Sequence, residues 1–269
     1  MDLHTPFYNK KLSMENKKFW TLRPDGTEVL RDLKKENESF TMEGYKNKEF
    51  DANNYQWFEM FHHYSFDDNG CDYERKGCYI REGDVVLDLG SNIGVFAHRA
   101  ETRGASKVIS FEPVTPTFNC LIKNRGPKTL VYKNAVGGKH GFTTFKIHTD
   151  YTHIGGGTSD DQDLLLNNKP IIHSERVIII GINEIFENIE SKIDFMKIDI
   201  EGGEVDVLTS ITDENLSSLR CLSGEFHKTY EEFDVFQQSF VERMERLGFK
   251  HFTLYHGDGT LITINFWKE

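Results

Sequence analysis

The chain has few cysteines, no long apolar run and no recognisable leader. Its 269 residues include four cysteines, none of them in a C-x-x-C pair, so neither a zinc knuckle nor a disulfide framework is indicated. No apolar run approaches the ~20 residues that a membrane-spanning helix needs. The N-terminus lacks the basic and apolar regions of a signal peptide. We therefore expect four free thiols, no membrane span and a cytoplasmic location.

Positive charge is also scarce. The formal net charge is −11 at pH 7, and the longest basic cluster is formed by Lys10, Lys11, Lys17 and Lys18. A protein that binds a nucleic acid backbone needs a dense surface of lysine and arginine. The composition therefore disfavours a nucleic acid partner and leaves a small molecule or a glycan as the expected one.

The chain lacks both common phosphate-binding loops. A dinucleotide-binding loop follows the pattern G-x-G-x-x-G, in which the second glycine admits the pyrophosphate. Residues 88–94 are Asp-Leu-Gly-Ser-Asn-Ile-Gly, with Asn92 where that second glycine would stand. No G-x-x-x-x-G-K-[ST] pattern occurs either. These absences oppose a nicotinamide cofactor.

What the loop does contain fits another cofactor. Residues 85–89 form an apolar run typical of a buried strand, and Gly90, Ser91, Asn92 and Gly94 follow it. Glycines at such a turn let the backbone approach a ligand closely. The carboxylate of Asp88 repels phosphate and attracts an ammonium group. S-adenosylmethionine has an ammonium, a sulfonium and no phosphate, so the loop predicts this cofactor; the alternative is an ordinary tight turn.

Two further strand ends extend the predicted pocket. Residues 107–112 form a second apolar strand that ends in Glu112, near the ~20-residue interval at which an acid binds ribose hydroxyls; a helix cap is the alternative. Pro113 and Pro116 then suit the start of a helix. A third strand ends at Asn134 and Ala135, where side-chain or backbone groups could meet an adenine ring.

At this point the chain resembles a known family, the FkbM-type S-adenosylmethionine-dependent methyltransferases. The resemblance rests on residues 86–94, on Phe111-Glu-Pro113, on Asn134-Ala135 and on Lys197-Ile-Asp-Ile-Glu-Gly-Gly-Glu204, the most distinctive of the four. It implies a class I methyltransferase fold and transfer of a methyl group to a hydroxyl, commonly on a sugar or a secondary metabolite. It does not fix the acceptor.

Alternating strand and helix patterns predict an α/β class I methyltransferase domain over residues 81–269. We expect a doubly wound, mostly parallel, seven-stranded Rossmann-like sheet that closes with a C-terminal antiparallel hairpin. Expected helices cover 92–103, 115–124, a short segment capped by Asn183, 204–211 and 231–247. Expected strands cover 85–89, 107–112, 130–134, 142–147, 176–180, 193–200, 220–226, 249–255 and 260–267.

Two segments outside this pattern are candidates for contacting the acceptor. Residues 1–80 carry no methyltransferase motif; Trp20 to Leu30 predicts a hairpin around Pro24-Asp-Gly26, and aromatics over 55–64 suggest a packed helix. This N-terminal extension either covers the acceptor side or closes the edge of the sheet. The long polar segment between Ile147 and Arg176 is interpreted as a lid, with a disordered excursion as the alternative.

Catalytic candidates lie at the ends of two later strands. Asp199 and Glu201 end the 193–200 strand, and Asp199 is also expected at the cofactor. Glu225 and His227 end the next strand, where a spacing of two puts them on one side. His227 could accept the hydroxyl proton, with Glu225 orienting it or binding the sugar; the alternative is a strand-end histidine that is hydrogen-bonded to a carboxylate. These groups could also hold Mg²⁺ or Mn²⁺, but we predict no metal because an Asp-Asp or Asp-Asn pair is absent.

We thus predict an S-adenosylmethionine-dependent O-methyltransferase. Two alternatives stay open from the sequence. One is a cofactor-binding protein without catalysis that acts through its aromatic N-terminal region. The other, opposed by Asn92, is a nicotinamide-dependent oxidoreductase. Oligomeric state is not indicated.

Overall fold

The structure, a computed structural model, describes residues 18–22, 27–32, 71–147, 171, 173–228, 233–256 and 261–269. Several predicted features lie outside these residues: the basic cluster except Lys18, the turn at Pro24-Asp-Gly26, the helix over 55–64, most of the predicted lid, the first residues of the 231–247 helix, and the turn of the C-terminal hairpin.

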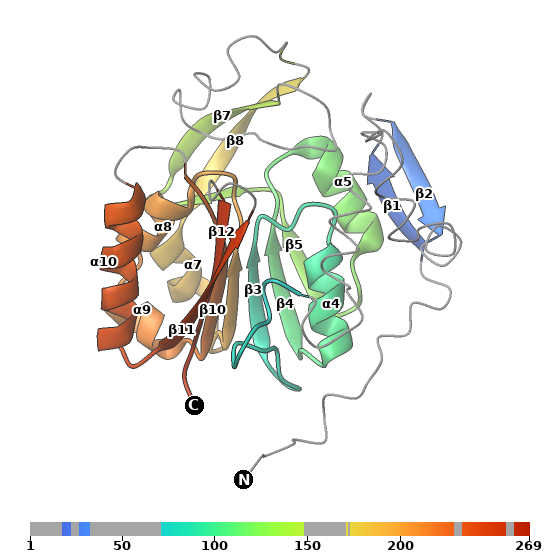
Figure 1. Cartoon of the computed structure of the whole chain (residues 1–269). Helices are drawn as coiled ribbons and strands as arrows, with labels where there is room; N and C mark the ends of the chain where they lie inside the picture. The colour runs from blue at the N-terminus through green and yellow to red at the C-terminus, as the bar shows by residue number, and fades with distance from the viewer. Residues whose placement is uncertain are drawn as a thin grey trace, which may run out of the picture.

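A seven-stranded sheet forms the centre of the molecule (Figure 1). Its order is β11 (Lys250–His256), β12 (Leu261–Trp267), β10 (Cys221–His227), β9 (Phe195–Ile198), β3 (Val85–Leu89), β4 (Lys107–Phe111) and β5 (Thr129–Tyr132). Strands β10, β9, β3, β4 and β5 pair in parallel, whereas β12 is antiparallel to both of its neighbours. The predicted fold class and the closing hairpin are confirmed.

Helices cover both faces of this sheet. Val86 packs in one core cluster with Phe96 and Ala100 of α4 (Val95–Arg103). The next residue, Leu87, packs in a second cluster with residues of α7 (Ile182–Asn188), α8 (Glu204–Ser210), α9 (Asp213–Ser218) and α10 (Phe233–Arg246). Because successive strand residues point to opposite faces, this division shows a doubly wound sheet. None of the helices that the structure describes has the length and apolar character required to cross a bilayer.

A second sheet has three strands and is hydrogen-bonded separately from the first one. It joins β6 (Ala135–Gly137), β8 (His173–Gly181) and β7 (Gly141–Ile147) in that order, with β7 antiparallel to β8. The sequence analysis predicted the strands over 142–147 and 176–180 but did not separate them from the main sheet. The first half of β8 alternates between exposed and less exposed residues, as expected for a sheet with one solvated face.

The predicted N-terminal hairpin is present and packs on α5 (Thr115–Asn124). Its strands are β1 (Lys18–Leu22) and β2 (Glu28–Asp32), which pair antiparallel. The Asn124 side chain donates to the carbonyl of Trp20 at 2.8 Å and to that of Ile93 at 2.8 Å. Phe19 and Leu22 share a core cluster with Ile93. The hairpin therefore contacts two elements: α5, which follows β4, and the loop that follows β3.

Residues 71–80 belong to the packing of the main domain. Cys71, Tyr73, Cys78 and Ile80 are buried against α4 and the sheet. In the same segment the buried Glu74 carboxylate forms an ion pair with Arg99 of α4. The packing therefore does not divide at residue 80, where the sequence analysis placed the end of the extension. All four cysteines are free and buried, as expected.

Two details of the helix starts differ from the prediction. Helix α4 begins at Val95 rather than Asn92, because Asn92 and Gly94 have φ angles of 48° and 95° and so lie outside the helical region. Asn183 does not cap α7: the cap position is Gly181 and no side chain bonds there. The Asn183 side chain instead donates to the carbonyl of Ser210 at 2.9 Å, which ties α7 to α8.

Candidate functional site

The loop after β3 is held by the two strands beside it. The amides of Gly90 and Ser91 both donate to the carbonyl of Phe111, at 3.1 and 2.9 Å. Gly90 has a φ of 76°, and a Cβ built on it would stand 1.6 Å from the carbonyl oxygen of Asp199. The sequence analysis explained this glycine by the approach of a ligand. The structure shows a second reason, because the end of β9 fills the space beside it.

Glu112 braces the same loop from the end of β4. Its two carboxylate oxygens accept from the amides of Asn92 at 3.0 Å and Val114 at 2.9 Å, and the residue is buried. Burial raises the pKa of Glu112 to about 7, against the effect of the two amide donors. The carboxylate thus fixes the backbone at the expected cofactor loop, while its contact with ribose hydroxyls stays a prediction.

Asp88 faces a buried lysine that sequence analysis did not assign. Asp88 has no exposed surface, and Ser110 donates to one carboxylate oxygen at 3.3 Å. The Lys197 amine lies 3.7 Å from the other oxygen and donates to the carbonyl of Gly90 at 2.6 Å. Lys197 is the first residue of the K-I-D-I-E-G-G-E pattern, which was the available signal. A direct contact between Asp88 and a ligand ammonium stays a prediction.

The remaining predicted cofactor residues lie beyond the ends of β4 and β5. Pro113 is half-buried and immediately precedes Val114, the residue before α5. The side-chain amide of Asn134 donates to the carbonyl of Ile178 at a long 3.5 Å. Ala135 is buried at the start of β6. Their contacts with a cofactor stay predictions.

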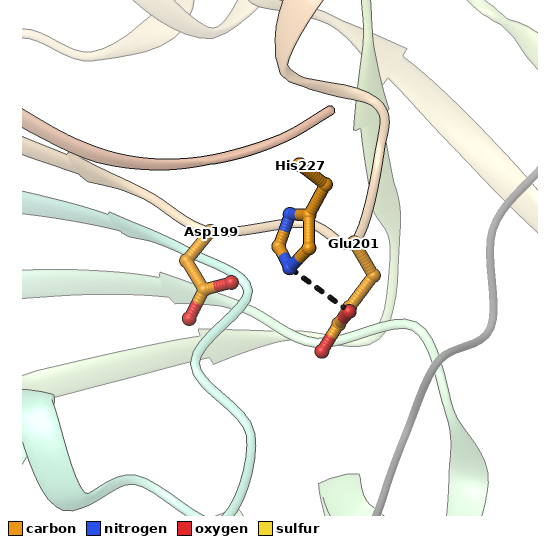
Figure 2. A group of neighbouring side chains, drawn as sticks. All are labelled: Asp199, Glu201 and His227. Carbon is orange, nitrogen blue, oxygen red and sulfur yellow. Dashed lines mark ion pairs between the residues drawn. The ribbon is translucent and has the colours of Figure 1, made fainter. Parts of the chain in front are cut away.

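Figure 2 shows Asp199, Glu201 and His227 pointing toward one another at the ends of β9 and β10. The His227 Nε2 atom lies 3.3 Å from Glu201 and 4.0 Å from Glu225, which confirms that Glu225 and His227 share one side of β10. The four side chains keep 21 to 39% of their surface exposed. A ligand can therefore reach them.

Glu204 is a further member of this group. It is buried, and one of its oxygens accepts from the amide of Ile200 at 2.9 Å and lies 3.3 Å from the His227 Nδ1 atom. Its other oxygen accepts from the amide of Gly202 at 3.0 Å. The sequence analysis gave Glu204 no place in the site. The structure shows that it fixes both the turn that carries Glu201, whose φ is 57°, and the His227 ring.

The charges around His227 decide its protonation. Burial by itself lowers the pKa of His227, but the Glu204 and Glu201 carboxylates outweigh burial and raise this pKa well above 6.5. Burial, and after it the Asp199 carboxylate, raise the pKa of Glu225 to about 7. Burial also raises the pKa of Glu201, to about 8. Near neutral pH the imidazole is therefore a cation, and the two neighbouring carboxyls of Glu225 and Glu201 are poised to gain or lose a proton, with Glu225 the more readily ionised of the two.

Asp199, Glu201 and His227 also form a possible cation site. Each offers one ligand atom, and these atoms lie within 4.8 Å of one another. Carboxylate oxygens with an imidazole nitrogen suit Mg²⁺ or Mn²⁺ among common cations. This is the donor set that the sequence analysis considered for a metal.

Tyr73 is the residue at this site that the sequence analysis missed completely. Its hydroxyl lies 2.8 Å from an Asp199 oxygen and 2.9 Å from a Glu225 oxygen. It comes from the segment before β3, where no pattern marked it. No sequence signal distinguishes it from the other tyrosines of the chain.

Comparisons with known proteins show the family of the chain. Residues 88–251 match the model of the methyltransferase FkbM domain, which is more than half of the chain. The chain belongs to the FkbM methyltransferase family. The residues that match this family model include the glycine loop, Glu112, Asp199, Glu225 and His227.

Three characterised proteins resemble the chain at 26 to 28% identity. The AMB antimetabolite synthetase AmbE of Pseudomonas aeruginosa is 26% identical, over 58% of this chain and 9% of AmbE. The 31-O-demethyl-FK506 methyltransferase FkbM of Streptomyces tacrolimicus is 26% identical, over 58% of this chain and 70% of that protein. The hexuronic acid methyltransferase AglP of Haloferax volcanii is 28% identical, over 57% and 60%. The similarity thus spans a small part of AmbE and over half of the other two.

Proposed function

We propose that the chain is an S-adenosylmethionine-dependent O-methyltransferase that acts on a hydroxyl of a sugar, a glycan or a secondary metabolite. The observation that carries the proposal is the meeting of two groups at one edge of the sheet. The glycine loop and Glu112 lie at the ends of β3 and β4. The second group, which consists of Asp199, Glu201, Glu225 and His227, lies at the ends of β9 and β10. Among the relatives, the name of FkbM gives an O-demethyl compound as its substrate, and the name of AglP gives a hexuronic acid.

The residues at the loop fit this cofactor better than a phosphate-bearing one. Two carboxylates, Asp88 and Glu112, flank the loop, and the nearby Lys197 amine is already bound to backbone carbonyls and to Asp88. Lys197 is therefore already engaged and, among the described contacts of the loop, is not available to neutralise a phosphate. We assign cofactor contacts to Asp88, Gly90, Ser91, Asn92, Gly94, Glu112, Pro113, Asn134, Ala135 and Asp199. When bound, the cofactor supplies an electrophilic methyl group.

The chain's own part in the reaction is alignment and proton removal. Glu225 suits the proton acceptor because its pKa of about 7 lies near physiological pH. His227 was the expected base, but a protonated imidazole has no lone pair to offer. We assign His227 the role of holding positive charge beside Glu225 and Glu201. Asp199 and Glu201 then bind the acceptor hydroxyls.

Calorimetry with the full chain tests the cofactor assignment. S-adenosylhomocysteine, the demethylated product, is the probe, and NAD⁺ is the comparison ligand. We expect binding of the former at a micromolar Kd, about −8 kcal/mol, and no binding of NAD⁺. A folded protein that binds NAD⁺ alone would contradict the proposal. Binding of the product without methyl transfer from labelled cofactor to any sugar of a monosaccharide and glycoside panel would favour the non-catalytic alternative.

Replacing Glu112 by alanine is expected to weaken binding of S-adenosylhomocysteine by about 1–3 kcal/mol. The change removes the predicted ribose contact and also frees the amides of Asn92 and Val114. The matched control is Glu101→Ala: Glu101 accepts from the amide of Lys128 at 3.1 Å and from the Thr129 hydroxyl at 2.5 Å, at the opposite end of the parallel strands. Equal affinities for the two variants by calorimetry would remove Glu112 from the cofactor site.

We further propose that methyl transfer needs no metal, because two cations already lie beside the carboxylates that face the acceptor: His227 is 3.3 Å from Glu201, and Lys197 is 3.3 Å from Asp199. Treatment with EDTA is expected to change turnover by less than about twofold, whereas a metal-activated site would lose most of its rate. A large loss that Mg²⁺ or Mn²⁺ restores would make Asp199, Glu201 and His227 the metal ligands instead.

A further inference from the structure

Neighbouring elements hold the ring and the backbone of Tyr73, and its hydroxyl reaches the candidate site. The residue is buried, and its ring meets the ring of Phe96 edge-on with centroids 5.6 Å apart. The preceding carbonyl, that of Asp72, accepts from the side-chain amide of Asn265 on β12 at 2.9 Å. The backbone and the ring are thus held from β12 and α4, so the hydroxyl has little freedom to move.

The hydroxyl connects carboxylates from two strands. It lies 2.8 Å from Asp199 Oδ2, just after β9, and 2.9 Å from Glu225 Oε2, within β10. A phenol has one proton to donate. The Tyr73 hydroxyl therefore lies between the two carboxylates and donates its hydrogen bond to one of them at a time. The same Asp199 oxygen is 3.3 Å from the Lys197 amine. The two acidic groups thus have the Tyr73 hydroxyl between them, and the Lys197 amine is a second donor beside Asp199.

We propose that Tyr73 is a positioning residue for methyl transfer, which fixes Glu225 and Asp199 so that the other oxygen of Glu225 faces the acceptor beside His227. The geometry of Glu225 supports this. Its Oε2 atom is bound to Tyr73, while its Oε1 atom lies 4.0 Å from His227 Nε2. This inference rests on the proposed function. It adds a residue that precedes the family match at 88–251.

The kinetic test is Tyr73→Phe, which keeps the buried ring and removes the hydroxyl. We expect kcat for methyl transfer to fall about 10–100-fold through lost alignment, with the Kd of S-adenosylhomocysteine unchanged within about twofold. The probes are methyl α-D-glucopyranoside and D-glucuronic acid with labelled cofactor. The matched control is Tyr255→Phe, whose side chain is exposed on the edge strand β11; it should behave as the parent protein does.

A double-mutant cycle distinguishes positioning from general damage. If Tyr73 acts through Glu225, then Tyr73→Phe should cost much less in a Glu225→Gln background than in the parent protein. Thermal unfolding and circular dichroism of each variant check that the fold is kept. A Tyr73→Phe variant with the parent kcat, or with the same loss in both backgrounds, would overturn the inference.

Infrared spectroscopy gives a readout that needs no acceptor. The carboxyl bands of Asp199 and Glu225 are identified by their loss in Asp199→Asn and Glu225→Gln. We expect Tyr73→Phe to shift these bands and Tyr255→Phe to leave them in place; unshifted bands in Tyr73→Phe would also overturn the inference. Failure of the proposed function looks different, because the parent protein itself would then either not bind S-adenosylhomocysteine or bind it without transferring a methyl group, whatever the infrared bands of Tyr73→Phe show.

Discussion

Replacing Gly90 by alanine is expected to cost more than ~4 kcal/mol of folding free energy, or to prevent folding. The added Cβ would lie 1.6 Å from the carbonyl oxygen of Asp199 and 2.7 Å from its carbon. These are backbone atoms, and the amide of Asp199 is bonded to the carbonyl of Leu89 at 3.1 Å. The clash can therefore be relieved only by moving β9 away from β3.

Comparison with a second glycine distinguishes the effect of this clash from the effect of backbone strain. Gly83 also has a positive φ, of 90°, but no atom lies within 4 Å of a Cβ placed there. Gly83→Ala is expected to cost only the ~1–2 kcal/mol of left-handed strain. Chemical denaturation of both variants gives the comparison. Equal costs for the two would show that the contact between the glycine loop and the end of β9 is not rigid.

Replacing Glu225 by glutamine is expected to lower methyl-transfer turnover by about 10²–10⁴-fold. The amide keeps the size of the side chain but cannot accept the hydroxyl proton. Binding of S-adenosylhomocysteine should be little changed, since the cofactor loop lies at β3 and β4. Glu242→Gln, a change of the same kind on the exposed side of α10, is the control.

The pH dependence of the rate follows from the same assignment. A proton acceptor must be ionised, and the pKa of Glu225 is raised to about 7. Turnover is therefore expected to rise with pH through about 7 in the parent protein, and Glu225→Gln should lack this limb. A larger loss in His227→Gln than in Glu225→Gln, with the limb kept in Glu225→Gln, would return the base to His227.

The sequence predicted the central sheet well because its strands carry a local signal. Strands β3, β4 and β9 are largely buried on both faces and appear as short apolar runs that one or two polar residues interrupt. The second sheet was harder to separate, because β6 is only three residues long and pairs with β8, more than forty positions later. No local pattern shows which sheet such strands join.

The candidate site shows the same limit. Asp199, Glu225 and His227 could be placed together because the carboxyl ends of parallel strands share one edge. Tyr73 could not be placed there. It belongs to a segment without periodicity, and the two residues that its hydroxyl contacts lie 126 and 152 positions further along the chain. The protonation of His227 was also out of reach, since it depends on Glu204, whose side chain turns back from α8 to the ring.

The amide group of Asn124 makes the first two strands a support for the cofactor loop. It accepts from the amide of Trp20 at 2.7 Å and donates to the carbonyls of Trp20 and Ile93. Ile93 lies between Asn92 and Gly94, in the loop itself. A chain shortened past residue 32 would lose two of these three bonds and expose Ile93 and Val95 to water. Trimming the N-terminus to simplify the protein would thus loosen the loop to which we assign the cofactor contacts.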